Sequence, residues 1–514
     1  PKRVHELNSA DEIVAHCRSG MRSAKAVDFL RQAGQQAMQR SAYPAAVEHL
    51  QRALSLLGGI ADPVERDERE LQLQSMLGSA LSATSGFAVQ EVAEAFERAR
   101  ELCGEGTDAA DLVRVLAGLG LLYINRGELG LAKAVGEELL ELAAERGDEL
   151  LLVAGHEVIG LAELRIGALS SCTRNLSIAV TAYADHVRSN GAGALGRNPA
   201  VSCGGFGAMA RWLLGFPDQA VTEVGDALSA GYSATPKQPF NLGYALLSSV
   251  WLHQFRGEST IVLDKARTAV EFATEHGFPV WYAHALVLQG WAETIEGEPA
   301  DGVAMIDQAL SAYDATGAVV WRPLFMLLHG ESLHRAGRLS EAVAVVDHAL
   351  DIAGSMIGYW WSAELNRLRG ELMLIQRPDD RDAAERCFRH AIDLAAAQDA
   401  KSLELRAGTS LTRLQLDRGD TAAGAGLTAC YEWFAEGFGT ADLVRARALL
   451  DQVGYQGPAG NRPAENRHEG NRSITDDVRP IIETHDQFCG RSDVIAVVRS
   501  ARASALQQLD AAPL

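Results

Sequence analysis

The sequence lacks long apolar runs and paired cysteines. No stretch of its 514 residues approaches the ~18 uncharged apolar residues that a membrane-spanning helix needs. Residues 1–6 lead into no apolar run of the kind found in secretory signal peptides. We therefore expect no membrane partner and a cytoplasmic protein. The seven cysteines are scattered without any Cys-x-x-Cys spacing, which argues against both a disulfide framework and a zinc site.

Positive charge is also scarce. The chain has 47 Lys and Arg against 67 Asp and Glu, a formal net charge of −20 at pH 7. Such a surface should repel phosphate backbones, so we expect no nucleic-acid partner. No G-x-x-x-x-G-K-[ST] loop occurs, and the literal G-x-G-x-x-G at 191–196 follows no strand pattern, so we interpret it as a loop between helices. The histidines lack H-E-x-x-H spacing, and we expect neither a cofactor nor a metal.

The sequence does contain a repeat with a period of about forty residues, which is typical of helical-repeat arrays. Segments that interrupt helices are centred on Gly127, Gly167, Gly215, Gly257, Gly297, Gly337, Pro378 and Gly419. Earlier turns at Ser41 and Gly86 extend the series to about ten units. Each unit should be a helical hairpin that buries its apolar face by stacking on its neighbours.

The units also agree internally. A small residue stands seven positions before the turn and another five after it, an apolar residue nine after it and alanine twelve after it. The pattern is complete in Gly34/Ser41/Ala46/Leu50/Ala53, Ala208/Gly215/Ala220/Val224/Ala227, Gly290/Gly297/Gly302/Ile306/Ala309 and Gly330/Gly337/Ala342/Val346/Ala349. Positions five, nine and twelve share one helical face, and small residues let two helices approach closely. This pattern resembles the tetratricopeptide repeat, and it predicts an all-α solenoid of about ten hairpins over residues 35–453.

The chain changes character at both ends. After Val453 the composition becomes polar with little to bury, so residues 454–514 are predicted to be a linker and tail with little order. Residues 1–34 instead suggest a strand, a loop and a helix. The run at 16–24 resembles the active-site loop of rhodanese-type sulfurtransferases.

The rhodanese resemblance implies a persulfide-forming nucleophile at Cys17, with Gly20 and Arg22 as residues of its loop. Backbone N–H groups around a sulfur at a helix N-terminus lower the thiol pKa. The resemblance covers a small part of such a domain, and a nucleophile needs a supporting shell to keep its geometry. We therefore interpret the segment as a remnant, with an active sulfurtransferase as the alternative.

Three tryptophans recur at the start of the first helix in successive units, namely Trp281, Trp321 and Trp361. Equal positions stack in a helical-repeat array, so these rings should form a ladder. Tryptophan is both a large core residue and a frequent binding hot spot. Packing between repeats is the favoured interpretation, and a binding stripe that includes Tyr282 and Arg322 is the alternative.

Two further runs resemble a family of signalling proteins. They are AKSLELRA at 400–407 and WFAEGFGTADL at 433–443. Residues 30–453 as a whole resemble the C-terminal helical-repeat region of large bacterial proteins in which a class III adenylate/guanylate cyclase domain or another effector precedes an AAA-type ATPase. The resemblance implies a regulatory array attached to a nucleotide-driven switch.

From these observations we expect a non-catalytic scaffold or sensor in bacterial signal transduction, which binds a protein or peptide on its concave face. One alternative is a rhodanese-type sulfurtransferase that uses Cys17. Another is a fragment of a nucleotide cyclase or ATPase whose catalytic domains lie upstream.

Overall fold

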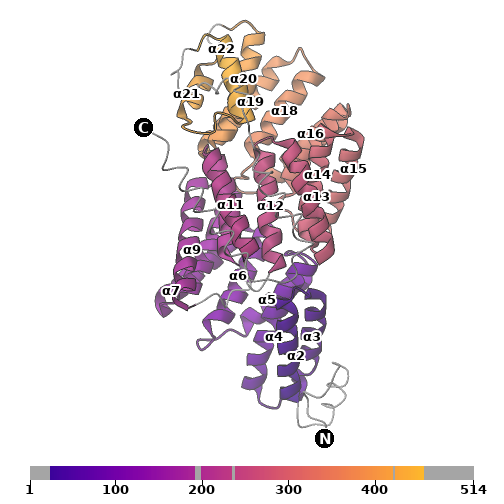
Figure 1. Ribbon diagram of the computed structural model, residues 1–514, viewed down its shortest axis with the longest axis vertical. Helices are drawn as coiled ribbons and strands as arrows, with labels where there is room; N and C mark the ends of the chain where they lie inside the picture. The colour runs from indigo at the N-terminus through magenta and orange to yellow at the C-terminus, as the bar shows by residue number, and fades with distance from the viewer. Residues whose placement is uncertain (1–22, 191–197, 234–237, 421–422, 456–514) are drawn as a thin grey trace, which may run out of the picture. The chain divides into compact units, whose positions relative to one another are not determined.

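A computed structural model describes residues 23–190, 198–233, 238–420 and 423–455, and within these ranges every regular element is helical (Figure 1). The predicted helix after the rhodanese-like loop begins at Ser23 and extends to Gln39. The strand and loop expected before it, the Gly-rich run at 191–196 and the polar tail after residue 455 lie outside the described residues. None of the described helices has both the length and the apolar character that a bilayer crossing demands.

Within the described residues the helices form ten consecutive pairs followed by one further helix. The first helices of the pairs are α2 (Ser23–Gln39), α4 (Pro63–Thr84), α6 (Ala109–Asn125), α8 (Glu149–Ile166), α10 (Pro199–Leu213), α12 (Pro239–Phe255), α14 (Pro279–Glu296), α16 (Arg322–Arg335), α18 (Ser362–Gln376) and α20 (Lys401–Asp417). The second helices are α3 (Tyr43–Ser55), α5 (Gln90–Glu101), α7 (Leu129–Arg146), α9 (Leu169–Asn190), α11 (Pro217–Ser233), α13 (Ser259–His276), α15 (Pro299–Asp314), α17 (Leu339–Ser355), α19 (Arg381–Ala397) and α21 (Ala425–Trp433). A short 3₁₀ turn, η2 (Leu57–Gly59), follows α3, and α22 (Ala441–Gln452) ends the described chain. The prediction of an all-α array of helical hairpins is confirmed.

Glycines in left-handed conformation make most of the turns between paired helices. The predicted turn residues Gly127, Gly257 and Gly337 have φ values of 75°, 74° and 74°. A second series, which includes Gly147 and Gly277, ends second helices with φ values of 65° and 67°. Only glycine adopts this backbone without steric cost, so the punctuation in the sequence corresponds to real helix ends.

The small residues inside each unit also have the role that their spacing predicts. A Cβ atom built on Gly290 would lie 2.7 Å from the carbonyl oxygen of Gly302, on the second helix of the same hairpin. A Cβ on Gly330 would lie 2.6 Å from Cγ2 of Val346. The two helices of a hairpin therefore approach so closely at these positions that larger side chains would prevent the contact.

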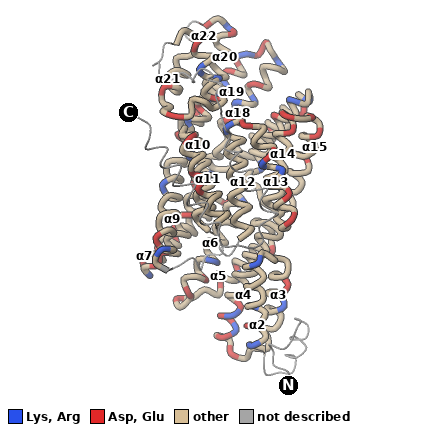
Figure 2. Tube along the Cα trace, viewed as in Figure 1, with Lys and Arg blue, Asp and Glu red and all other residues tan. Residues whose placement is uncertain are grey.

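First and second helices differ in how much of their surface is buried. The second helix α13 buries a single stripe, formed by Val262, Ala266, Ala269 and Ala273. The first helix α12 is buried on nearly all sides and contains no Lys, Arg, Asp or Glu. Figure 2 shows the same contrast, with charged residues on the outer helices and little charge on α10 and α12. A helix that is apolar nearly all round belongs in an interior, so first helices of the middle units such as α10 and α12 line the inside of the array.

Units that are far apart in the sequence also contact one another. Helix α4 touches α14, and α10 touches α20, so each of these units meets the fifth unit after it. The backbone N–H of Val319 donates to the carbonyl oxygen of Asn125 at 2.9 Å, and that of Gly437 donates to Oδ2 of Asp218 at 3.0 Å. The array thus forms a superhelix, which we call the winding. Its successive superhelical turns contact one another, and we call this line of contact the seam. The inner face of the winding is covered by the chain's own side chains.

Candidate functional site

Aromatic side chains from several units meet inside the winding. The rings of Trp251 and Trp321 have centroids 5.0 Å apart, and those of Tyr244 and Trp281 are 4.3 Å apart. Phe87, from the turn between α4 and α5, reaches Trp281 with a centroid distance of 6.1 Å. These contacts join units that the sequence separates by almost two hundred residues. We call this region the aromatic interior.

The aromatic interior contains a cavity of about 40 Å³. One water molecule needs ~10–15 Å³ by this measure, so the space can hold a few waters or one small chemical group. Its wall is mostly aromatic and aliphatic, with a few polar side chains. The lining residues include Phe87, Arg165, Phe206, Tyr244, Trp281, His284 and Trp321.

Arg165 is the cation in the wall of this cavity. Its side chain is 2% exposed, and its Nε and Nη1 atoms have no hydrogen-bond partner. The guanidinium carbon lies 4.5 Å from the ring centroid of Trp321, 4.8 Å from that of Trp360 and 4.9 Å from that of Phe206. Burial lowers the pKa of Arg165 to about 10, so the group is still protonated at neutral pH. The groups that act on this pKa are tyrosines and a cysteine, and no carboxylate is among its main influences.

The local sequence explains how the chain holds a charge at this depth. Arg165 stands in the last turn of α8, immediately before Ile166 and the left-handed Gly167 that ends the helix. The carbonyl groups of a helix C-terminus stabilise a positive charge there. Three aromatic faces around the guanidinium add cation–π attraction of ~0.5–2 kcal/mol each. These terms offset part of the desolvation cost of Arg165, but they occupy none of its hydrogen-bond donors.

Two further donors belong to the cavity wall. Trp251 donates its Nε1–H to Nδ1 of His284 at 3.1 Å. Burial and then the charge of Arg165 lower the pKa of His284 to about 3, so the ring is neutral and carries its proton on Nε2. The Nε1–H of Trp281 is buried and has no acceptor. Arg165, Trp281 and His284 all line the cavity, and Arg165 and Trp281 have buried donors without a hydrogen-bond partner.

The structure brings two of the three predicted tryptophans together. Trp281 and Trp321 both line the cavity, with side chains 6% and 5% exposed. Trp361, which is 1% exposed, stacks on Trp212 instead, with centroids 6.2 Å apart and an interplanar angle of 15°. All three rings pack inside the protein, but the first two also face a space that a ligand could enter.

The other predicted site residues lie elsewhere. The Tyr282 hydroxyl accepts a hydrogen bond from Nε2 of Gln308 at 2.8 Å. Arg322 forms a bidentate ion pair with Asp314, at 2.8 and 3.1 Å. Neither lines the cavity. The rhodanese-like residues at positions 17, 20 and 22 lie outside the described residues.

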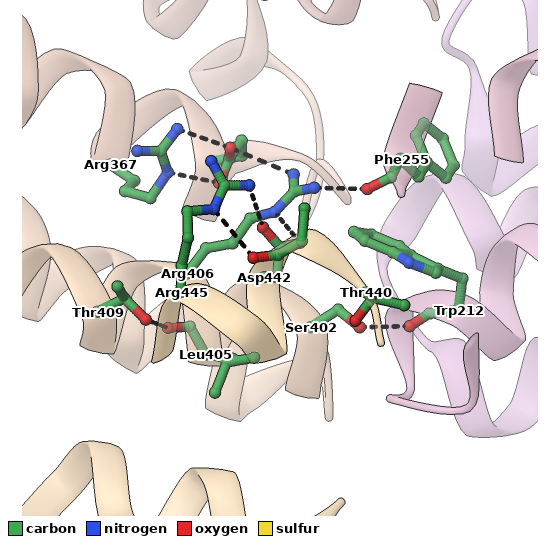
Figure 3. A network of polar contacts seen from close by, with 12 residues as sticks. Trp212, Phe255, Arg367, Ser402, Leu405, Arg406, Thr409, Thr440, Asp442 and Arg445 are labelled. Carbon is green, nitrogen blue, oxygen red and sulfur yellow. Dashed lines mark hydrogen bonds and ion pairs between the residues drawn. The ribbon is translucent and has the colours of Figure 1, made fainter. Parts of the chain in front are cut away.

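A polar network at the seam closes the winding near its C-terminal end (Figure 3). Arg406 of α20 bonds through Nε to Oδ2 of Asp442 at 2.8 Å and through Nη1 to Oε1 of Glu364 at 3.4 Å. It also donates to the carbonyl oxygen of Phe255 at the end of α12. Burial opposes ionisation of Glu364, but Arg367 and Arg406 together hold the pKa of its carboxyl below the ordinary value. We call Glu364, Arg367, Arg406 and Asp442 the seam network.

Among the described residues, neither the Cys172 and Cys430 thiols nor the possible metal ligands form a candidate site. Burial raises the pKa of the Cys172 and Cys430 thiols, the latter to about 12, so both stay protonated and weakly reactive at neutral pH. Among the residues that the structure describes, no group of three or more His, Cys, Asp or Glu side chains is placed to hold a metal ion.

Sequence reasoning did not identify Arg165 or His284 as site residues. Arg165 is one of many arginines close to a predicted turn, and its burial depends on α10 and on the loops before α16 and α18. The sequence contains no local signal for a contact between units so far apart.

No protein-family model matches the sequence, and no curated protein matches it. The structure is similar to that of a Rap protein in complex with competence and sporulation factor, with a TM-score of 0.51 and 13% identity over 73% of this chain and 99% of that protein. It is more distantly similar to a signal transduction ATPase with a tetratricopeptide repeat sensor from Pyrococcus horikoshii, with a TM-score of 0.35 and 14% identity over 80% and 66% of the two chains. At such low identity a likeness concerns the fold alone. Together with the helix pairing, the likeness to the Rap protein identifies the fold as a tetratricopeptide-like helical repeat.

Proposed function

We propose that this chain is a non-catalytic sensor array in bacterial signal transduction, the regulatory region of an ATPase- or cyclase-type protein. The observation that carries the proposal is the unpaired cation of Arg165 beside a cavity inside the winding. Buried charges in proteins are normally paired, so an unpaired one next to an empty space suits a ligand site.

The position of the cavity supports a sensing role. Its wall combines residues from the turn after α4 with residues of α14 and the N-terminal end of α16. A ligand in the cavity would contact units on successive turns of the winding. A ligand that binds only when these turns are in contact would stabilise that contact, and the stabilisation would grow with the logarithm of ligand concentration. Ligand occupancy would then change how the turns hold together, which an attached effector could detect.

The Rap protein of similar fold was solved with competence and sporulation factor bound. We extend to this chain only the general role of binding a partner, and a protein or peptide is one class of ligand to test.

The test is a screen of the full chain against small organic acids, their neutral analogues and short peptides. Thermal melting and tryptophan emission report binding, because several of the eight tryptophans surround the cavity. We expect at least one ligand class to raise the melting temperature and to slow amide hydrogen exchange near the backbone contact between Asn125 and Val319. If stabilising ligands leave exchange at this contact unchanged, ligand binding in the cavity does not affect how the turns hold together, and the sensor proposal is wrong.

Sulfurtransferase activity at Cys17 is tested separately, with thiosulfate as the sulfur donor and Cys17→Ser as the control. We expect equal turnover from the two proteins. Turnover that disappears in the variant would restore the enzymatic alternative.

A further inference from the structure

We infer that the cavity beside Arg165 binds the carboxylate group of a ligand whose adjoining atoms are apolar. The inference rests on the proposed function, because it names the ligand chemistry of the same site. Three observations lead to it: the charge, the donors and the lining of the cavity.

The charge requires an anion. Arg165 is buried, protonated at neutral pH and without a carboxylate partner among the groups that influence it. Cation–π contacts with Phe206, Trp321 and Trp360 stabilise the guanidinium plane but leave Nε and Nη1 without acceptors. A guanidinium presents its donors in a fork that fits a planar carboxylate with two parallel hydrogen bonds.

The donors favour a group that only accepts. Trp281 adds a buried Nε1–H without a partner, and His284 keeps a proton on Nε2. An ionised carboxylate accepts hydrogen bonds and donates none. Among the described residues, no Lys and no second Arg line the cavity, so a dianion such as phosphate would bring more charge than Arg165 neutralises. A single negative charge matches the site.

The lining and the volume restrict the rest of the ligand. Phe87, Phe206 and Trp321 present aromatic surface to the space. A cavity of about 40 Å³ has room for a carboxylate and a few attached apolar atoms. Either a small apolar acid or the terminal carboxylate of an apolar peptide presents this chemistry.

The experiment measures binding to the full chain by calorimetry and tryptophan emission. One set of probes is acetate and butyrate, with acetamide and butyramide as uncharged counterparts. A second set is a short apolar peptide with a free or an amidated C-terminus. Inorganic phosphate tests the preference for a single charge.

The variants isolate the guanidinium. Arg165→Met removes the charge at similar length, and Arg165→Lys keeps a charge without the fork. Arg369→Met is the matched control, because Arg369 is ion-paired with Asp347 and does not line the cavity. Melting curves establish that each variant is folded before binding is measured, and Arg165→Lys serves if Arg165→Met does not fold.

We expect a carboxylate to bind at least ~10-fold more tightly than its amide, since the free energy of a hydrogen bond to a charged group corresponds to about tenfold or more in Kd. Arg165→Met should remove the preference, Arg165→Lys should weaken binding, and Arg369→Met should bind like the wild type. Preference for the small acids or for the free peptide terminus identifies the source of the carboxylate.

Other results overturn the inference while leaving the sensor proposal intact. Equal binding of acid and amide, unchanged binding in a folded Arg165 variant, or tighter binding of phosphate would each show that the site does not recognise a carboxylate. So would stabilisation of the chain by a neutral ligand alone. The sensor proposal fails on a different readout, namely unchanged hydrogen exchange at the seam when a ligand is bound.

Discussion

The seam network provides the sharpest test of how the winding is held closed. In Arg406→Ala, the carboxylates of Glu364 and Asp442 lose one partner each, and the carbonyl of Phe255 loses its donor. Side-chain exposure is 3% for Glu364, 13% for Asp442 and 15% for Arg406, so these charges are screened little by water. Breaking a buried pair costs ~3–5 kcal/mol. Because Arg367 still pairs with Glu364, we expect a loss near the lower end, about 3 kcal/mol.

The same carboxylate offers a matched control. Arg445 also pairs with Asp442, at 2.9 Å, but its side chain is 60% exposed. Exposed ion pairs contribute ~0–1 kcal/mol, so Arg445→Ala should stay within about 1 kcal/mol of the wild type. Denaturant unfolding followed by tryptophan emission measures both values.

The location of the damage distinguishes loss of the seam from general destabilisation. Repeat arrays open unit by unit, so Arg406→Ala should speed amide exchange first where α12 and α20 meet. Exchange in α2 and α3 should be unchanged. Equal losses in Arg406→Ala and Arg445→Ala, or faster exchange throughout the chain, would refute the idea that this network joins two turns of the winding.

Four further substitutions test the packing and the charge state of His284. Gly290→Ala should cost ~1–3 kcal/mol by denaturant unfolding, because its Cβ would lie 2.7 Å from the carbonyl oxygen of Gly302. Trp321→Ala should cost ~3–5 kcal/mol, and Trp433→Ala, whose ring is 42% exposed, less than half of that; equal costs would contradict the packing described. The pKa of His284 is about 3 in the folded protein and 6.5 when unfolded, so the unfolded chain binds the extra proton and stability falls as pH drops from 6.5 towards 3, by up to ~1.4 kcal/mol per pH unit. His284→Gln should remove that part of the pH dependence. Equal slopes of unfolding free energy against pH in the variant and the wild type would show that the folded ring takes up the proton as readily as the unfolded one.

The sequence alone determined the repeat architecture. Helix, turn and hairpin contacts are local, so a period of about forty residues, turn glycines such as Gly127 and Gly337, and small residues such as Gly290 and Gly330 were enough to predict them. A left-handed backbone and a close approach of two helices both restrict which residue can stand at a position, because few side chains tolerate either.

Only the tertiary structure decided what the tryptophans and Arg165 do. Their surroundings depend on which turns of the array meet, and this depends on a small rotation between neighbouring units that accumulates along the chain. No residue type records that rotation. The sequence is therefore compatible with both packing and binding roles for Trp281 and Trp321, and it does not distinguish Arg165 from the other arginines. Each of the units of α4 and α10 contacts the fifth unit after it. This contact makes the same residues the wall of a cavity beside an unpaired positive charge.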